Sequence, residues 1–445
     1  MANLVLEDKS KARTFGLDTL RKEAEAFLEK GTEAGFANPQ SIAEGPYNGK
    51  RALVNGREQV DVTRLDYLSL GLNGIVREIM KECLDRFNVS CPTSQMALKS
   101  ETNIRLEKAI AEFHGMEDSV MFLSGYAANE NIIQALAFRS RVPHLLAYAR
   151  DTKMGFETRD IPTEFFVDEE SHYSLQYPIR SAKAQLGEMC LAQRFPTQNH
   201  DYLRQLLKKS YDRRGDKSFR VIVSDTISSM SGKVYNVNSL CEIAEEFDCL
   251  LYLDEAHAIG TWGNGGEGIA SGLAEFEKYK DRILIMGTLT KAVSQLGGYV
   301  AVPNQTLSCF LRACSPYYIF SAPLSPWLAE VVIQILELIR GDYGKDEREK
   351  LWDVSAHMRE RLLIEGFDIL GSESQIIPVL IGQESKSIQA KAFLESRGYA
   401  ASLFIFPAVP KGKSILRFSL CSDITRNEVE EIVAILKEAR KEFGF

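Results

Sequence analysis

The segment that decides the fold runs from Cys249 to Val302, with the sequence CLLYLDEAHAIGTWGNGGEGIASGLAEFEKYKDRILIMGTLTKAVSQLGGYVAV. It opens with an apolar run, residues 249–253, that is followed by Asp254 and, three positions later, by His257. A glycine-rich loop comes next, and a second apolar run ends in GTLTK, whose last residue is Lys291. We predict two buried parallel strands that carry polar groups at their carboxyl ends, where ligands bind in an open α/β sheet.

The polar residues at these two predicted strand ends suit one cofactor, pyridoxal phosphate (PLP). Lys291 follows Thr288 and Thr290, and Asp254 places a carboxylate at the neighbouring strand end. In PLP enzymes a lysine forms a Schiff base with the cofactor, and a carboxylate pairs with the pyridinium nitrogen. The same two residues could instead be a solvated surface lysine and an aspartate that caps a helix. We predict the PLP site because an apolar run precedes each residue.

A third predicted strand leads into a turn that suits an anion. The apolar run 119–123 is followed by SGYAAN, in which Gly125, Tyr126 and Ala127 open a predicted helix. Backbone N–H groups at a helix N-terminus have no partner within the helix and attract phosphate. These residues would form a phosphate cup, although an ordinary strand-to-helix turn has the same sequence pattern.

Two more apolar runs end in polar residues in the same way. The run 164–167 precedes DEESH, which ends at His172, and the run 219–223 precedes SDTISSMSG, which contains Ser229. A lone histidine is more often structural than functional, but the position of His172 after a strand favours a ligand role. Strands that alternate with helices at this spacing predict parallel β-α units and a doubly wound sheet.

The pattern along the chain predicts an α/β protein in several parts. We expect a large, doubly wound, mostly parallel sheet domain and a smaller α+β domain, because strands and helices are segregated near the C-terminus. The expected boundaries are an N-terminal arm with part of the small domain at 1–70, a large domain at 71–325 and a C-terminal small domain at 326–445. The charged piece 139–162 looks like an inserted surface excursion.

Composition narrows the possible partners. The chain has 445 residues and a formal net charge of −8, so it lacks the basic character of a nucleic-acid-binding protein. It contains no apolar run of the length of a membrane span, and its opening residues lack the apolar core of a secretory signal. Its eight cysteines include no C-x-x-C pair, which argues against a metal site or a disulfide framework. We therefore expect a cytoplasmic protein that acts on small molecules.

Taken in order, the motifs resemble those of the α-oxoamine synthases. These fold-type I PLP enzymes join an amino acid to an acyl thioester with loss of carbon dioxide. The resemblance spans residues 65–432 and rests on DYL, FLSGYAAN, DEESHYS, SDTISSMSG, DEAHAIGTWGNGGEG, GTLTKA, YIFSAPLSP, SQIIPVLIG and ILRFSL. The C-terminal run from SESQIIPVLIG to FSLCSDIT also resembles the branch that makes amino-ketone precursors of quorum-sensing autoinducers.

The resemblance implies the residues that do the chemistry. Lys291 corresponds to the Schiff-base lysine, which also removes the α proton of the amino acid. Asp254 corresponds to the partner of the pyridinium nitrogen, and His172 to the residue that stacks on the ring. Arg417, in ILRFSL, corresponds to the clamp on the substrate carboxylate, although lone mid-strand charges usually face water.

The resemblance also implies how the cofactor is held. His257 and Ser229 correspond to partners of its ring hydroxyl. The phosphate would be bound by the N–H groups of the cup and by the hydroxyl of Thr288. A hydroxyl from a facing subunit, at Ser321, would complete the site, which implies a homodimer with its active site at the subunit interface.

The substrates implied are an amino acid and an acyl-CoA or acyl-carrier protein, and the product is an α-amino ketone. The sequence departs from the family pattern at residues 91–96, CPTSQM, and at Asn103, where a histidine is usual. Ala322 replaces a second hydroxyl beside Ser321. Two alternatives remain open: an aminotransferase on the same fold, and a non-catalytic partner subunit, against which the presence of Lys291 argues.

Overall fold

The computed structural model describes the chain except for residues 1–16, 34–42, 55, 72 and 140–160. Most of the predicted insertion at 139–162 therefore lies outside the described residues. The chain divides into two compact units, residues 1–59 and residues 60–445. The predicted domain boundaries near residues 70 and 325 stay predictions.

The larger unit is built on a seven-stranded sheet. Its strands are β4 (Asp118–Phe122), β5 (Thr163–Asp168), β6 (Cys190–Phe195), β7 (Phe219–Asp225), β8 (Leu250–Asp254), β9 (Ile283–Thr288) and β10 (Gly298–Val302). Their order is β4-β10-β9-β8-β7-β5-β6. Neighbours from β9 to β6 pair in parallel, and β10 pairs antiparallel with both β9 and β4. All strands except β10 thus end at the same edge.

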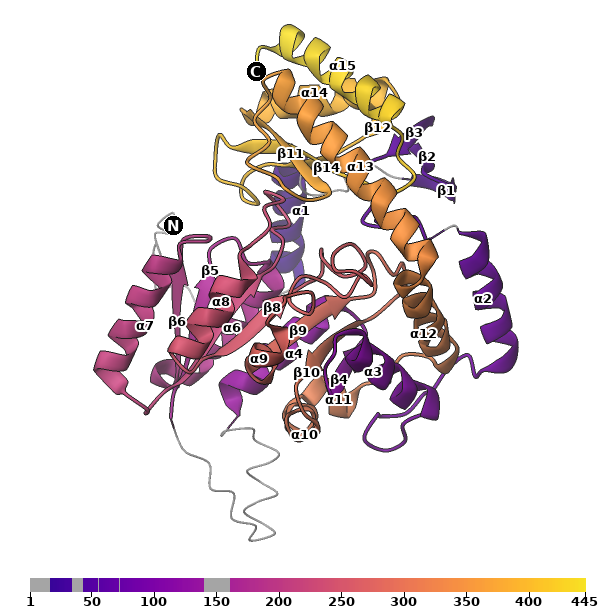
Figure 1. Cartoon of the computed structure of the whole chain (residues 1–445). Coiled ribbons are helices and arrows are strands. Elements are labelled where there is room, and N and C mark those ends of the chain that lie inside the picture. Colours follow the sequence, from indigo (N-terminus) through magenta and orange to yellow (C-terminus); the bar gives the residue numbers. More distant parts are fainter. Residues whose placement is uncertain (1–16, 34–42, 55, 72, 140–160) are drawn as a thin grey trace. The chain divides into compact units, whose positions relative to one another are not determined.

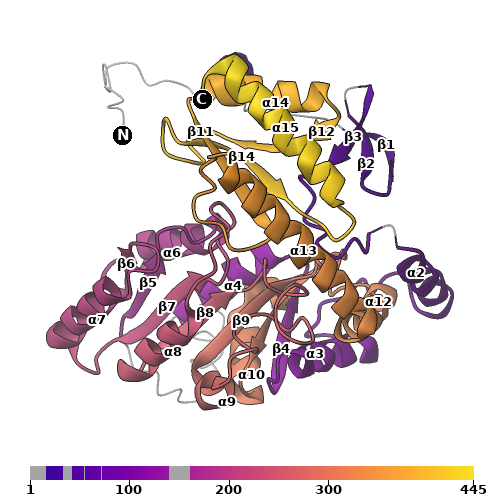
Figure 2. The same cartoon turned by 45° about the horizontal axis from the view of Figure 1, so that its top comes forward.

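Helices cover both faces of this sheet (Figure 1 and Figure 2). On one face lie α4 (Gly125–Phe138) and α6 (Tyr173–Leu186), and on the other lie α7 (His200–Arg214) and α8 (Val237–Glu246). Successive strand residues alternate between two cores: Val221 and Val223 pack with α4 and α6, whereas Ile222 packs with α7 and α8. A strand buried on both faces reads as a continuous apolar run, as the sequence showed.

The remaining helices of this part surround the sheet. They are α2 (Gly74–Arg86), α3 (Glu101–Phe113), α9 (Phe276–Tyr279), α10 (Gln305–Cys314) and α11 (Pro316–Phe320), with short 3₁₀ turns at Gly187–Met189 and Lys280–Arg282. Polar caps define where several begin. Asn73 caps α2 and Ser100 caps α3 through side-chain oxygens that accept backbone N–H groups.

The C-terminal part is an α+β arrangement. Its elements are α12 (Pro326–Arg340), α13 (Asp342–Ile364), β11 (Ile376–Gly382), α14 (Glu384–Ser396), β12 (Tyr399–Ala400), β13 (Ser402–Phe404), β14 (Ser414–Ser419) and α15 (Arg426–Phe443). Strands β11, β14 and β13 form an antiparallel sheet in that order. Thr425 and Glu428 form a capping box at the start of α15.

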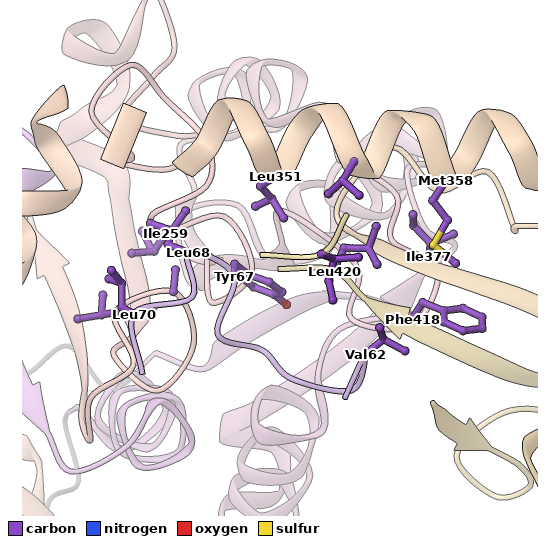
Figure 3. Close-up of a cluster of buried hydrophobic side chains, with 14 of the residues drawn as sticks. Val62, Tyr67, Leu68, Leu70, Ile259, Leu351, Met358, Ile377, Phe418 and Leu420 are labelled. Atoms are coloured by element: carbon purple, nitrogen blue, oxygen red, sulfur yellow. The ribbon is translucent and has the colours of Figure 1, made fainter. Parts of the chain in front are cut away.

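A buried apolar cluster ties the C-terminal part to residues just after position 60. Figure 3 shows Leu351 and Met358 of α13 above side chains of β14 and of the segment that follows Asp61. Phe418 and Leu420 pack in the same cluster, and so does Tyr67, which is fully buried. The packing of this cluster fixes the position of the Tyr67 side chain.

The first unit contains α1 (Leu17–Glu33) and a hairpin of β1 (Ala43–Asn48) and β2 (Arg51–Val54). Gly49, in the turn between these two strands, has φ +61°, a backbone conformation that favours glycine. Strand β3 (Arg57–Asp61) continues into the larger unit, where Val60 and Asp61 pair in parallel with β12.

The fold class is confirmed, with two strands that the sequence did not reveal. The antiparallel β10 and the edge strand β6 were not predicted. Among the described residues, no helix combines the length and the apolar character needed to cross a membrane.

Candidate functional site

A cavity of about 230 Å³ opens at the carboxyl ends of the central strands. Its walls come from the ends of β7, β8 and β9 and from the first turn of α4. The wall residues that had been predicted as site residues are Gly125, Tyr126, His172, Ser229, Asp254, His257, Thr288 and Lys291. Motifs up to 166 positions apart in the sequence thus meet in one pocket, because parallel strands end at one edge.

Lys291 and His257 are in direct contact in the wall of this pocket. The Nζ of Lys291 lies 2.8 Å from the Nε2 of His257. The pKa of Lys291 is lowered to about 8, chiefly by burial, with Asp254 opposing the shift and the cation of Arg417 adding to it. Burial also holds the pKa of His257 well below its usual value, with help from Lys291 and Arg417. The site therefore favours an uncharged imidazole and keeps part of the lysine as a free amine near neutral pH.

Asp254 is held by two hydrogen bonds at the end of β8. Its Oδ2 accepts from Asn129 Nδ2 at 2.7 Å, and its Oδ1 accepts from the backbone N–H of Ala256 at 3.0 Å. Tyr252 donates to Asn129 Oδ1 at 2.8 Å, which fixes the orientation of the amide. The carboxylate is thus anchored in a buried network and directed into the pocket.

A second carboxyl, Asp225, lies beside Asp254 on the neighbouring strand. The two residues are register partners in β7 and β8. Burial and the nearby charge of Asp254 raise the pKa of Asp225 well above its usual value. Because two adjacent buried carboxyls resist double ionisation, the pair carries one negative charge. Asp254 accepts hydrogen bonds at 2.7 and 3.0 Å and Asp225 accepts one at 3.3 Å, an arrangement that favours the charge on Asp254.

His172 lies at the N-terminus of α6, next to the same network. Its Nδ1 lies 2.7 Å from Ser174 Oγ, and Asn129 donates to that same oxygen at 2.8 Å. Burial lowers the pKa of His172, so the ring is uncharged at neutral pH. An uncharged flat ring fixed in this way suits the predicted stacking role.

The anion end of the pocket lies at the start of α4. Ser124 caps the helix by accepting the N–H of Ala127 at 3.1 Å, so that N–H is already used. The predicted phosphate contact of Ala127 is therefore not open in this structure, and the N–H groups of Gly125 and Tyr126 are those left at the helix start. A Cβ at Gly125 would come within 3.0 Å of Thr288 Cβ. Glycine thus lets the Thr288 hydroxyl lie against the helix N-terminus.

Arg417, on β14, is not part of the pocket wall but contacts Ser229, which is. Its Nη1 donates to the carbonyl of Ser229 at 2.8 Å, and its guanidinium lies 4.6 Å from the ring centre of Phe404. The Nε of Arg417 is buried and has no hydrogen-bond partner among the described residues. A planar cation with a donor to spare is what a carboxylate needs.

The structure does not bring Ser321 into this pocket. It follows α11, and its Oγ is buried with no hydrogen-bond partner among the described residues. The prediction placed Ser321 in the site of a facing subunit, so its role stays a prediction.

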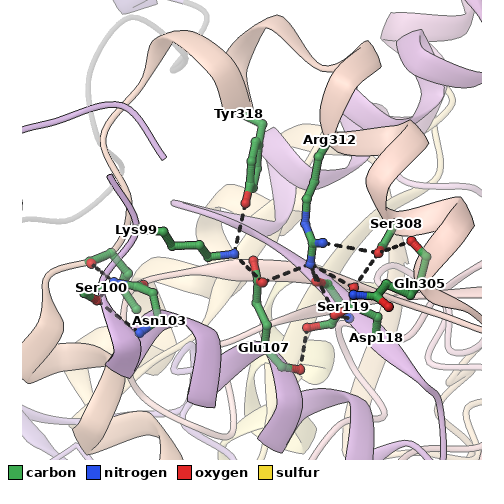
Figure 4. Close-up of polar contacts among 11 residues, drawn as sticks. Lys99, Ser100, Asn103, Glu107, Asp118, Ser119, Gln305, Ser308, Arg312 and Tyr318 are labelled. Atoms are coloured by element: carbon green, nitrogen blue, oxygen red, sulfur yellow. Dashed lines mark hydrogen bonds and ion pairs between the residues drawn. The ribbon is translucent and has the colours of Figure 1, made fainter. Parts of the chain in front are cut away.

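Asn103, one of the positions where the sequence departs from the family, lies near a polar cluster that is not part of the cavity wall (Figure 4). Lys99 binds Glu107 and Tyr318, and Arg312 binds Glu107 at 2.9 Å. Asn103 donates to Ser100 Oγ at 2.7 Å and to the carbonyl of Leu324 at 3.0 Å. In this chain Asn103 thus joins α3 to the segment before α12.

Polar residues of the site that were missed from the sequence include Tyr67, Asn129 and Asp225. Tyr67 OH lies 2.6 Å from the Nδ1 of His257. Each of the three stands inside a motif that was quoted, DYL, SGYAAN or SDTISSMSG. The only available signal in the sequence was the position of a polar residue after a buried strand or at the start of a helix. Neighbouring polar residues have the same positions, so this signal did not single out the three.

These features define a class of protein, the fold-type I PLP-dependent enzymes. A helix N-terminus for an anion, a carboxylate fixed by Asn129 and a lysine of lowered pKa fit the phosphate, the ring nitrogen and the aldehyde of PLP. The family model for aminotransferases of class I and II matches residues 150–436, so the chain belongs to that family.

Comparison with known proteins gives the nearer relatives. The chain is 27% identical to the 8-amino-7-oxononanoate synthase of Symbiobacterium thermophilum, over 93% of this chain and 96% of that protein. It is 27% identical to the serine palmitoyltransferase of Sphingobacterium spiritivorum, over 94% and 95% of the two chains. The solved serine palmitoyltransferase of Sphingomonas wittichii has a TM-score of 0.79 at 23% identity, covering 96% of this chain and 98% of that one.

The two named relatives are α-oxoamine synthases, which confirms the resemblance at that level. PLP as the cofactor and a PLP-dependent acyltransferase as the class of enzyme are confirmed too. The autoinducer branch is not distinguished by these comparisons.

Proposed function

We propose that this protein condenses an amino acid with an acyl thioester and releases an α-amino ketone. The Cα of the amino acid forms a bond to the acyl carbon, the C–S bond breaks, and the carboxylate leaves as carbon dioxide. One proton is taken up, and the thiol is released. The observation that supports this best is a buried lysine with its pKa lowered to about 8, in one pocket with Asp254 and near an arginine with a buried donor to spare.

PLP, when bound, supplies an aldehyde for the amine and a ring that withdraws electrons from Cα. The protein's own groups do the rest. Arg417 holds the substrate carboxylate through its guanidinium fork. The Nζ of Lys291 takes the α proton and later returns a proton to the same carbon. Asp254 holds a fixed negative charge at the far wall of the pocket.

The finer features of the proposal come from the sequence. The C-terminal motifs support an amino ketone of the kind that serves as a precursor of quorum-sensing autoinducers. A homodimer in which Ser321 contributes a hydroxyl to the site of the facing subunit follows from the resemblance to the α-oxoamine synthases. The acyl donor is an acyl-CoA or an acyl-carrier protein.

The test is a product analysis with a panel of amino acids and acyl-CoAs. We expect free CoA, carbon dioxide and an amino ketone in equal amounts, each dependent on both substrates. A keto acid formed from the amino acid alone, with no free CoA, would show an aminotransferase instead. No reaction together with no PLP bound would support the non-catalytic subunit.

Replacement of Arg417 by leucine should weaken binding of the amino acid. The loss of charge-assisted hydrogen bonds corresponds to a rise of roughly 10- to 100-fold in its KM. Arg417→Lys keeps the charge but loses the fork, so we expect an intermediate rise. Steady-state kinetics with both substrates varied would measure this. A rise in the KM of the acyl thioester, with the amino-acid KM unchanged, would contradict the assignment.

A further inference from the structure

His257, which contacts Lys291 in the pocket, also contacts a buried residue outside the pocket wall. His257 has one ring nitrogen, Nε2, 2.8 Å from Lys291 Nζ, and the other, Nδ1, 2.6 Å from Tyr67 OH. An uncharged imidazole carries a single proton, so one nitrogen donates and the other accepts. The group bound to Nδ1 therefore decides which nitrogen faces the pocket as a donor.

Tyr67 is placed to act as a donor to Nδ1. Its side chain is fully buried, and its carbonyl accepts from the N–H of Ser422 at 2.9 Å. Figure 3 shows the ring surrounded by apolar side chains of the cluster that includes Leu68 and Leu420. Burial raises the pKa of Tyr67, so the phenol keeps its proton. A buried hydroxyl proton needs an acceptor, and Nδ1 is within hydrogen-bond distance.

The position of Gln375 also favours donation from the Tyr67 hydroxyl to Nδ1 of His257. The Nε2 of Gln375 donates to the carbonyl of His257 at 2.8 Å, which anchors the amide beside the imidazole backbone. Gln375 also lowers the pKa of Tyr67, against the dominant effect of burial, as an amide N–H near the phenol oxygen does. An amide N–H on that side is consistent with a phenol that directs its own proton to Nδ1 of His257, 2.6 Å away.

We propose that Tyr67 is a positioning residue that fixes the tautomer of His257, so that Nε2 carries the proton and presents an N–H donor to the cofactor pocket. That donor meets an oxygen anion in the pocket or the lone pair of an uncharged Lys291, and it opposes an ammonium, which cannot accept. Tyr67 therefore acts on Lys291 through His257. The inference rests on the proposed roles of these two residues but not on the identity of the substrates.

The first measurement needs neither cofactor nor substrate. In the apoprotein labelled with ¹⁵N-histidine, NMR reports which ring nitrogen of each histidine is protonated, and the signals of His257 are assigned by their loss in His257→Gln. We expect Nε2 protonated and Nδ1 bare near neutral pH. A proton on Nδ1 in the wild-type protein would overturn the proposal, even if Tyr67 variants did not fold.

The second measurement uses Tyr67→Phe. Without the phenol, Nδ1 can carry the proton and Nε2 can accept from an ammonium, so the pKa of Lys291 should rise. The loss of one hydrogen bond corresponds to about one pH unit. The readout is the pH midpoint of the rate at which PLP is captured by the apoprotein, since only the free amine reacts. The other charged or titratable groups that influence the amine stay in place: Asp225, Asp254, His172 and Arg417.

Tyr299→Phe is the matched control. Tyr299 is also fully buried, and its OH lies 2.8 Å from the Nε2 of His114, a buried histidine outside the pocket walls. Both variants lose a buried Tyr–His hydrogen bond, and both should lower thermal stability. Only Tyr67→Phe should move the capture midpoint and shift His257 toward the Nδ1–H tautomer. A folded Tyr67→Phe protein with both readouts unchanged would show that Tyr67 merely fills space.

Discussion

Replacement of Lys291 by alanine should reduce amino-ketone formation by about 10³-fold or more. The variant loses the amine that takes and returns the α proton, and general acid–base catalysis contributes on the order of 10²- to 10⁴-fold. It also loses the group that holds PLP covalently. Borohydride reduction followed by peptide mapping should place the cofactor on Lys291 in the wild-type protein and nowhere in the variant.

Two further variants separate the amine from the charge. Lys291→Arg retains a cation but cannot provide a free amine, so it should be as inactive as the alanine variant. Lys278→Ala is the control, because Lys278 precedes β9 and thus lies at the opposite end of that strand. It should keep full activity. Cofactor attached to another lysine, or substantial activity in Lys291→Arg, would contradict the assignment.

The parts of the site that the sequence predicted share a local signal. Lys291, Asp254 and His172 each follow an apolar run, and parallel strands bring such positions to one edge. Alternation of strands and helices was enough to predict that edge. It was also enough to indicate the helix N-terminus at Gly125, because a strand that turns directly into a helix leaves N–H groups without partners.

The missed parts depend on contacts between distant residues. Tyr67 lies 190 positions from His257, so its hydroxyl could be assigned only once the packing of the C-terminal part was known. Asn129 reaches Asp254 across 125 positions. The direction of β10 was equally hidden, because its apolar run, Gly298–Val302, has the same pattern whether the strand runs parallel or antiparallel.

Asp254 and Asp225 offer the sharpest test of where the charge of the pocket lies. Asp254→Asn keeps the shape but removes the charge, and its amide nitrogen must face one of two existing donors, Asn129 Nδ2 or the N–H of Ala256. We expect kcat to fall by about 10²- to 10³-fold, the usual loss when a fixed electrostatic contact in an active site is removed. Binding of PLP should weaken as well.

Asp225→Asn is the matched comparison, because it makes the same chemical change on the neighbouring strand. Burial and the nearby charge of Asp254 raise the pKa of Asp225 well above its usual value, so a neutral amide there resembles the protonated carboxyl that this shift favours. The side chain of Asp225 accepts from the backbone N–H of His172 at 3.3 Å, and an amide oxygen can accept from it as well. The loss should stay below about tenfold, within the effect of one hydrogen bond. Equal losses in kcat for the two variants, measured at pH 7 with PLP saturating, would mean that the charge is shared or lies on Asp225, because the two hydrogen bonds that favour Asp254 would then not decide its position.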